Sequence, residues 1–278
     1  MIERVRRNLR WARVIARLGL PVSLRAYAAY RGVRWPGGAR WAACFTFDLD
    51  YEEDERALPV VLGAFAATST RASFACIGAH VALRPAPYRD IASAGHEVVN
   101  HSMTHPFHRV ISPSRHWNEL SRPEVDDEVR RAHEVLSALA GRPPVGFRAP
   151  HFERNATQGE ALAALGYAYA SSGLHAEQEP SDGLPVLVGR VPEIPIHRSA
   201  STWAHFRGPG ASPEQWEPST AAILDKERRR GGLAVFCLDP QDVASSNGGL
   251  RRLLDRARDG GAWVGTMIDL IRHIEDAP

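Results

Sequence analysis

The sequence predicts an α/β fold of parallel strands joined by crossover helices, and two observations favour a βα barrel. From residue 41 onward, short apolar segments alternate with longer amphipathic segments, a pattern typical of parallel sheets. In addition, the reactive side chains follow directly on the ends of several predicted strands. Because barrels collect their chemistry at the carboxyl ends of their strands, we favour a barrel over an open sheet, which would show the same alternation.

Local sequence signals support the placement of some of these elements. An acidic run at residues 52–55 follows the first strand, and it suits a helix N-terminus because acids there complement the helix dipole. Residues 173–213 are rich in Gly, Pro and Ser, so we expect loops there, around the mouth of a site. The expected strands are 41–48, 72–76, 96–99, 145–147, 168–171, 186–188, 192–196 and 233–238, and the expected helices are 55–67, 86–94, 122–140, 157–165, 214–230, 248–258 and 266–275.

Residues 1–34 differ from the rest and are predicted to form a basic helical extension, followed by the barrel domain at 35–278. Nine arginines in this extension face a single acid, Glu3. Four of the arginines form a stripe beside an apolar arc on the helical wheel, and Gly19 and Pro21 should end this helix. Two interpretations stay open: peripheral contact with an anionic membrane surface, or packing against the barrel or a second subunit.

Composition restricts the class of protein. The chain is 44% hydrophobic and 24% charged, as in globular proteins, and its net charge of +2 does not indicate a nucleic-acid partner. Cys44, Cys76 and Cys237 lie in apolar segments, so we expect buried thiols in a reducing compartment. Neither a secretory signal nor an apolar segment long enough to span a membrane is evident. We therefore predict a cytoplasmic protein, with contact at the inner membrane surface through residues 1–34 as an open interpretation.

Two short motifs carry the candidate chemistry. His101 and His105 are one helical turn apart, so both imidazoles can reach one metal ion. Asp48 and Asp50 are two apart on a strand and share a face, where like charges require a cation or a proton. One aspartate can then bind the metal while the other acts as general base. The alternatives are an acidic loop start and two exposed histidines. Two histidines with one carboxylate suit zinc, and also cobalt, nickel, manganese or iron.

Four further residues are candidates for the same site. Arg148 follows the strand predicted at 145–147, where its guanidinium can hold a carboxylate in place; a surface ion pair is the alternative. His151 and His197 either bind substrate or form the wall of the pocket. Trp203, in the irregular region, can stack on a sugar ring or seal its loop against the barrel.

These motifs resemble the polysaccharide deacetylase (NodB-homology) family, carbohydrate esterase family four, over roughly residues 35–275. Three motifs follow the family's order: Thr46-Phe-Asp-Leu-Asp50, His-Ser-x-x-His at 101–105, and Arg-x-Pro at 148–150. Trp35-Pro-Gly-Gly38 and the Asp-x-Asp spacing are similar to the branch with peptidoglycan-deacetylase-like and allantoinase-like members. The resemblance implies a deformed barrel of seven or eight strands. It also implies Asp50, His101 and His105 as metal ligands, Asp48 as base, and Arg148 as the tether of Asp48.

One position departs from the family's pattern. Members usually carry a histidine near the end of a late strand, where it protonates the leaving amine, and Asp239 stands there in this chain. Loss of a general acid typically costs about 10²–10⁴ in rate. Asp239 can keep a proton near neutral pH if it is buried beside other acids. Alternatively, His151 or His197 supplies the proton, or the reaction does not need it. We expect Asp239 in the pocket, with an altered role.

The sequence thus predicts a metal-dependent hydrolase that removes an acetyl or formyl group from the nitrogen of an amino sugar or glycan. A lipid-linked sugar is one candidate substrate, and the oligomeric state is left open. Two alternatives use the same barrel. One is hydrolysis of a cyclic amide or ureide, as by allantoinase-like relatives. The other is a sugar-binding barrel that has lost turnover together with its histidine.

Overall fold

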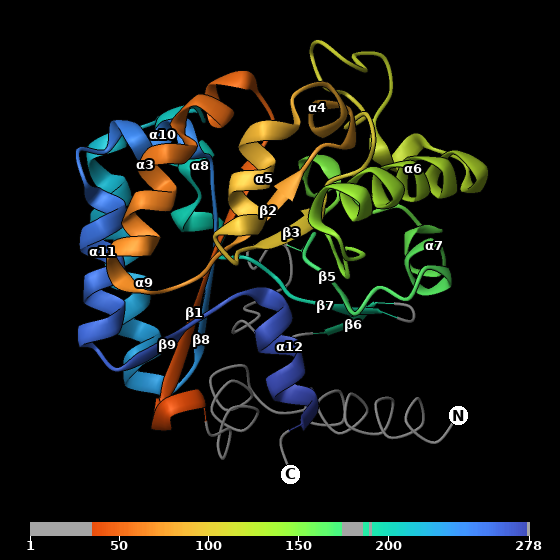
Figure 1. Ribbon diagram of the computed structural model, residues 1–278. Coiled ribbons are helices and arrows are strands. Elements are labelled where there is room, and N and C mark those ends of the chain that lie inside the picture. The colour runs from red at the N-terminus through yellow and green to blue at the C-terminus, as the bar shows by residue number, and fades with distance from the viewer. Residues whose placement is uncertain (1–34, 174–185, 189–190, 277–278) are drawn as a thin grey trace.

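The computed structural model describes residues 35–173, 186–188 and 191–276, which form a curved sheet with helices around it (Figure 1). Parallel strands and crossover helices alternate along this part of the chain, as the sequence predicts. The strands are β1 (Trp41–Leu49), β2 (Ser73–Cys76), β3 (Glu97–Asn100), β4 (Gly146–Phe147), β5 (Tyr169–Ala170), β6 (Val186–Val188), β7 (Val191–Glu193), β8 (Leu233–Leu238) and β9 (Ala262–Val264).

The sheet of the described residues curls into a deformed barrel. Its strand order is β6-β7-β5-β4-β3-β2-β1-β8, with β9 also paired to β1, and every pair is parallel except β6 with β7. After β7, the Ile196 amide donates to the Gly173 carbonyl and the His197 amide to the Val235 carbonyl, both at 2.9 Å. This segment connects the β5 side of the sheet to β8. The predicted fold class is therefore confirmed.

Strand β1 separates two cores. Its side chains alternate because successive residues of a strand point to opposite faces. Phe45 and Phe47 point outward to Phe65 of the first core helix, at centroid distances of 6.2 and 5.8 Å. Cys44 joins the inner core, which also contains Tyr169 of β5 and apolar residues of the last helix. All nine residues of β1 are buried. Its outer face packs against the helices, whereas its inner face can carry polar groups near the carboxyl end of the strand.

Helices cover the outside of the sheet (Figure 1). The longest, α6, begins with a capping box in which the Glu124 carboxylate accepts from the Ser121 amide, and it ends at Gly141 with φ 66, a conformation that glycine adopts without strain. The helices are α3 (Glu52–Thr68), α4 (Gly78–Leu83), α5 (Pro85–Ser93), α6 (Arg122–Ala140), α7 (Gln158–Ala164), α8 (Thr202–Phe206), α9 (Trp216–Arg230), α10 (Pro240–Ser245), α11 (Gly249–Asp259) and α12 (Met267–Asp276), with short 3₁₀ turns at Pro36–Gly38, Trp117–Glu119, Pro150–Phe152, Arg198–Ala200 and Pro213–Gln215.

The predicted elements match these bounds closely, and four short ones were missed. Helices α4, α8 and α10 and strand β9 were not predicted, because elements of three to six residues carry too little periodicity to be recognised. Residues 173–213 were predicted as loops around strands at 186–188 and 192–196; β6 and β7 lie at those two strands, and the helix α8 was not predicted. The predicted N-terminal helix falls on residues 1–34, outside the described residues.

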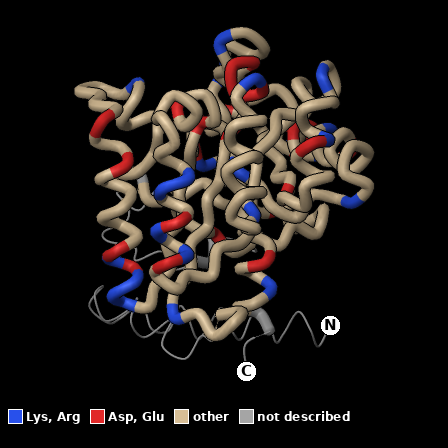
Figure 2. Tube along the Cα trace, turned by 60° about the vertical axis from the view of Figure 1, so that its left-hand side comes forward, with Lys and Arg blue, Asp and Glu red and all other residues tan. Residues whose placement is uncertain are grey.

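Within the described residues, none of the helices combines the length and apolar character needed to cross a bilayer. The three cysteines are buried and unbonded to one another, as expected. Figure 2 shows basic and acidic residues interspersed along the helices of the face in view, and many of them are paired within four residues of one another, such as Arg130 with Glu134. Pairs of this exposed kind contribute little to stability.

Removal of Glu97 should destabilise the base of the barrel. Its buried carboxylate accepts from Ser73 Oγ at 2.6 Å, Tyr169 Oη at 2.8 Å and the Ile268 amide at 3.1 Å. Glu97→Ala leaves three buried donors without a partner, each costing about 1–3 kcal/mol, so we expect a loss of about 3–5 kcal/mol in the free energy of unfolding, measured by urea denaturation. Glu97→Gln should lose much less, because it keeps an acceptor and burial already raises the pKa of Glu97 towards the neutral form. Equal losses in the two variants would contradict this role.

Candidate metal centre and active site

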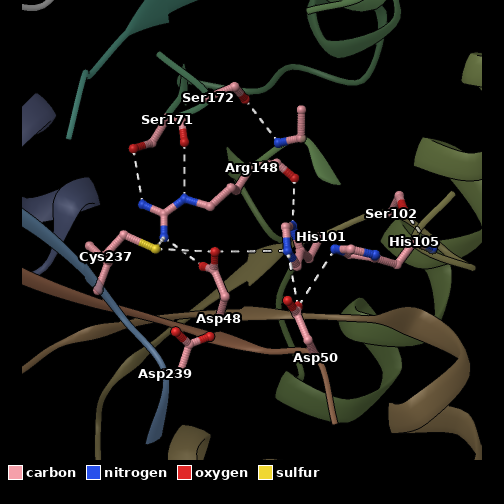
Figure 3. Close-up of polar contacts among 12 residues, drawn as sticks. Asp48, Asp50, His101, Ser102, His105, Arg148, Ser171, Ser172, Cys237 and Asp239 are labelled. Atoms are coloured by element: carbon pink, nitrogen blue, oxygen red, sulfur yellow. Dashed lines mark hydrogen bonds and ion pairs between the residues drawn. The ribbon is translucent and has the colours of Figure 1, made fainter. Parts of the chain in front are cut away.

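The carboxyl ends of β1 and β3 bring Asp48, Asp50 and His101 together (Figure 3). Strand β1 ends at Leu49, so Asp48 and Asp50 leave its inner face at the carboxyl edge. Strand β3 ends at Asn100, and His101 follows directly. Because β1 and β3 both pair with β2 in parallel, their carboxyl ends lie at the same edge of the sheet. The topology therefore places the aspartates opposite the histidines.

Asp50, His101 and His105 form a candidate metal site. One nitrogen or oxygen atom of each lies within 4.8 Å of the others. Asp50 Oδ1 is 3.3 Å from His101 Nε2 and 3.6 Å from His105 Nε2. Asp50 Oδ1 and His105 Nε2 are buried and have no hydrogen-bond partner among the described residues. Unpaired buried polar atoms are costly, and one cation would satisfy both. The donor set, two imidazoles and one carboxylate, therefore fits a divalent metal ion.

The tautomer of His101 and the protonation of His105 and Asp50 also suit a cation. His101 Nδ1 donates to the Arg148 carbonyl oxygen at 2.8 Å, so its Nε2 is left to face Asp50. Burial lowers the pKa of His105 well below its usual value, against the opposing charge of Asp50, and so favours the neutral imidazole. Burial acts to raise the pKa of Asp50. The nearby His105 and His101 lower it by a larger amount, so the pKa of Asp50 lies well below its usual range.

The two histidines converge through a turn and not through a helix, which corrects the helical-turn interpretation of their spacing. Ser102 and His105 have φ of 64° and 52°, which excludes a right-handed helix. The turn is held by polar side chains. Asn100 Oδ1 accepts from the Ser102 amide at 2.8 Å, and Ser102 Oγ accepts from the His105 amide at 3.0 Å. Glu128 of α6 accepts from the amides of Met103 and Thr104 at 2.9 and 2.8 Å.

Asp48 is held by two buried donors. Arg148 Nη1 donates to Asp48 Oδ1 at 2.6 Å, and Cys237 Sγ donates to Asp48 Oδ2 at 3.2 Å. Arg148 is fully buried and is itself fixed by Ser171, whose carbonyl accepts from Nε at 2.9 Å and whose hydroxyl accepts from Nη2 at 3.1 Å. Asp48 Oδ2 also lies 3.9 Å from His101 Nε2. The carboxylate is therefore fixed beside the candidate metal site without being part of it.

Asp239 lies near Asp48, directly after β8, the strand that pairs with β1 (Figure 3). Phe47 pairs with Leu238 in the β1–β8 ladder, so Asp239 follows at the level of Asp48. Its Oδ2 accepts from Thr202 Oγ1 and Arg207 Nη2, both at 2.6 Å. Burial raises the pKa of Asp239 to about 7; Arg207 opposes this shift, and the charge of Asp50 adds to it.

The remaining predicted residues lie at different depths. The His151 ring is exposed and its centroid lies 4.8 Å from that of His105, at the rim of the candidate metal site. His197 is buried against β8, where its Nδ1 lies 3.2 Å from the backbone of Val235, so it belongs to the barrel wall. Trp203 is 49% exposed on α8, next to Thr202, which contacts Asp239.

Several residues around the site had no recognisable sequence signal. Arg207 bridges Asp239 and Asp242, at 2.6 and 2.8 Å, although a long stretch of chain separates it from both. Cys237 was predicted only as a buried thiol, and its contact with Asp48 depends on the register of β8 against β1. Glu128 is one of many acids on α6. Alternation of side chains along β8, which puts Cys237 and Asp239 on one face, could have indicated Cys237.

Residues 33–170 match the family model for polysaccharide deacetylase. The chain carries a polysaccharide deacetylase domain of the NodB-homology family. A chitooligosaccharide deacetylase of Bradyrhizobium sp. (strain ANU 289) is 36% identical to it over 94 residues, which are 34% of this chain and 39% of that protein. The chain thus matches well under half of the length of this curated relative.

Solved structures share the fold of the deacetylase domain. A protein from Mycobacterium smegmatis, described as a candidate polysaccharide deacetylase, has a TM-score of 0.74 and 26% identity, covering 87% of this chain and 93% of its own. The Puue allantoinase has a TM-score of 0.71 and 15% identity, covering 87% of this chain and 92% of its own. At that identity the second similarity concerns the fold alone.

Glu128→Ala should weaken metal binding by the deacetylase domain. The variant removes the acceptor for two amides and for Thr104 Oγ1 at 2.8 Å, which loosens the turn that carries His105. Groups hydrogen-bonded directly to metal ligands typically contribute 10–100-fold to metal affinity; Glu128 acts on the backbone between the two histidines, so we expect a loss near the lower end, about tenfold, when zinc is titrated calorimetrically. Glu134→Ala, on the exposed face of the same helix, is the matched control and should leave the affinity unchanged. Equal zinc affinity in both variants would exclude this role for Glu128.

Proposed function

We propose that the protein is a metal-dependent deacetylase that removes an acetyl or formyl group from the nitrogen of an amino sugar or glycan. The observation that carries the proposal is the grouping of Asp50, His101 and His105 around buried, unpaired ligand atoms, with a separate carboxylate, Asp48, held beside them by Arg148. Membership of the polysaccharide deacetylase family and the chitooligosaccharide deacetylase relative support a carbohydrate substrate.

We assign Asp50, His101 and His105 as ligands of one divalent ion, with zinc as the first choice and cobalt, nickel or manganese as alternatives. When bound, such an ion supplies Lewis-acid chemistry, which lowers the pKa of water to about 7 and polarises an amide carbonyl. The three ligands leave room for that chemistry because two nitrogens and one oxygen do not complete a coordination shell.

Asp48 then acts as the general base that takes a proton from the attacking water. A base must lie within hydrogen-bond reach of the proton it removes, and the 3.9 Å between Asp48 Oδ2 and His101 Nε2 puts the carboxylate at the edge of the ligand set. Arg148 and Cys237 each donate to one of its oxygens. These donors fix the direction of the carboxylate and leave further lone pairs for the proton.

We assign Asp239 as the group that returns a proton to the leaving amine, in place of the family's histidine. A pKa of about 7 leaves a large share of Asp239 protonated at neutral pH, which is the range in which general acids work best. Its Oδ2 is taken by Thr202 and Arg207, so the proton is carried on Oδ1. His151, at the rim, and Trp203, on α8, are proposed to contact the substrate, whereas His197 in the barrel wall is a weaker candidate.

The cellular setting remains a prediction from sequence. We propose a cytoplasmic location, and a lipid-linked sugar at the inner membrane surface would require peripheral contact through residues 1–34. Sedimentation with anionic vesicles, with and without residues 1–34, tests that contact.

Asp48→Asn should abolish most of the activity while leaving the metal in place. Loss of a general base typically lowers the rate about 10²–10⁴-fold, and the asparagine side chain keeps the shape that Arg148 contacts. Amine release from N-acetylated and N-formylated sugars, together with metal analysis, measures both effects. An unchanged rate would reject Asp48 as the base. Release of product from a cyclic amide or ureide, with none from the sugars, would favour the alternative hydrolase.

The alkaline side of the pH–rate profile should depend on Asp239. The charged groups that face it are Arg207, Asp242, Asp50 and Asp54. Because the acid must be protonated to donate, and protonation is lost as the pH rises through about 7, the rate should fall above that pH.

Asp239→Asn should lower the neutral rate about 10²-fold and remove this alkaline limb from kcat measured between about pH 5 and 9. Asp242→Asn, which removes the other carboxylate on Arg207, should keep the limb. A limb that persists in Asp239→Asn would exclude this assignment. A large gain of activity in Asp239→His would instead identify the native site as impaired.

A further inference from the structure

An exposed aromatic ring lies beside the candidate metal site and is not accounted for by the roles above. Phe107 follows His105 by two residues and is 46% exposed. One face of its ring is stacked on His116, with centroids 3.8 Å apart and an interplanar angle of 21°. His116 is held in turn by Glu153 Oε1 at 2.5 Å from Nδ1. His116 therefore covers one face of Phe107, and the exposed surface of Phe107 lies away from His116, on the part of the ring that His151 also approaches with its centroid 5.9 Å away.

The backbone holds this ring outward at a cost. Phe107 has a φ of 66°, a left-handed conformation that is uncommon for a bulky residue. Of the seven non-glycine residues with positive φ in the described part of the chain, five surround this site: Ser102, His105, Phe107, His151 and Phe152. Such conformations cost about 1–3 kcal/mol each and cluster at functional sites. An apolar side chain that a strained backbone holds in an exposed position, with only part of its ring packed against His116, indicates a ligand.

The position of the ring defines which part of a substrate it can meet. The His151 centroid lies 4.8 Å from that of His105 and 5.9 Å from that of Phe107. Phe107 is therefore one side chain further from the metal ligands than His151. The sugar that carries the reacting acyl group must lie at the ligands themselves, so Phe107 is placed for the sugar next to it.

We propose that Phe107, backed by His116, is a stacking platform for the sugar ring adjacent to the one that is deacetylated, and that the substrate is a glycan of at least two sugars. This inference rests on the proposed function. The apolar C–H face of a pyranose ring matches the exposed apolar surface of an aromatic side chain, while the polar edge of the sugar can be met by His151 and by Glu153, whose Oε1 already binds His116. A small cyclic amide would have no ring to place there.

The test compares variants at Phe107 on short and long substrates. Phe107→Asn removes the ring and keeps the left-handed backbone, which Asn tolerates, so the turn that carries His105 should be undisturbed. Phe107→Trp keeps an aromatic face. Val110→Asn is the matched control, because Val110 is 74% exposed three residues later on the same loop. Metal content and thermal unfolding are measured for every variant.

The substrates are the N-acetylglucosamine monosaccharide and its tetramer. We expect Phe107→Asn to raise KM for the tetramer about tenfold, with kcat and the monosaccharide's kcat/KM nearly unchanged. Phe107→Trp and Val110→Asn should behave as wild type on both substrates. Binding of the tetramer to the inactive Asp48→Asn protein, measured by calorimetry, should weaken by the same factor when Phe107→Asn is added.

The outcomes separate the platform from the proposed function. Tetramer turnover with unchanged KM and unchanged binding in Phe107→Asn would overturn the platform and leave the deacetylase intact. Weakened tetramer binding in Phe107→Asn, in a protein that deacetylates neither sugar, would overturn the function and keep the platform. Equal losses on the monosaccharide and the tetramer, or no binding of either, would overturn the platform as a site for the adjacent sugar.

Discussion

The structure depends on two carboxylates that share one face at the end of β1. Asp48 and Asp50 are largely withdrawn from water, with side-chain exposures of 8% and 21%, and two buried like charges repel strongly unless positive groups compensate. Arg148 compensates the first, and the divalent ion proposed at His101 and His105 would compensate the second. The dependence is mutual, because a guanidinium as deeply buried as that of Arg148 is tolerated only when it is paired and fully hydrogen-bonded.

Much of this arrangement could be predicted from the sequence, because it follows from periodicity and strand ends. Alternation along β1 put Asp48 and Asp50 on one face, and strand order then brought His101 and Arg148 to the same edge. The turn at 101–105 was not predictable in the same way, since it depends on Ser102 and on Glu128 from a helix further along the chain. Spacing alone cannot distinguish such a turn from a helix.

Contacts that depend on the register of strands far apart in the sequence could not be predicted either. The Cys237 thiol contacts Asp48 only because Phe47 pairs with Leu238, and the same pairing brings Asp239 close to Asp48. Asp239 was anticipated from its place at the end of a strand, whereas Arg207 was not, because it directly follows the short helix α8, which the sequence did not predict. In the mechanism proposed above, Asp239 takes the place of the family's histidine, with a pKa that burial raises against the opposing effect of Arg207.

Strand β1 also has a consequence for how the chain reaches this structure. It pairs with β2, its near neighbour, on one side, and with β8 on the other, where Thr46 Oγ1 donates to the Phe236 carbonyl 190 residues away. Until β8 is available, one edge of a long and strongly apolar strand has no partner. Non-local pairing of this kind slows folding, and unpaired strand edges promote aggregation. The yield of folded protein should therefore depend on how well the unpaired edge of β1 is protected during synthesis. Slow expression and a supply of chaperones should raise that yield more than an increase in the stability of the folded state.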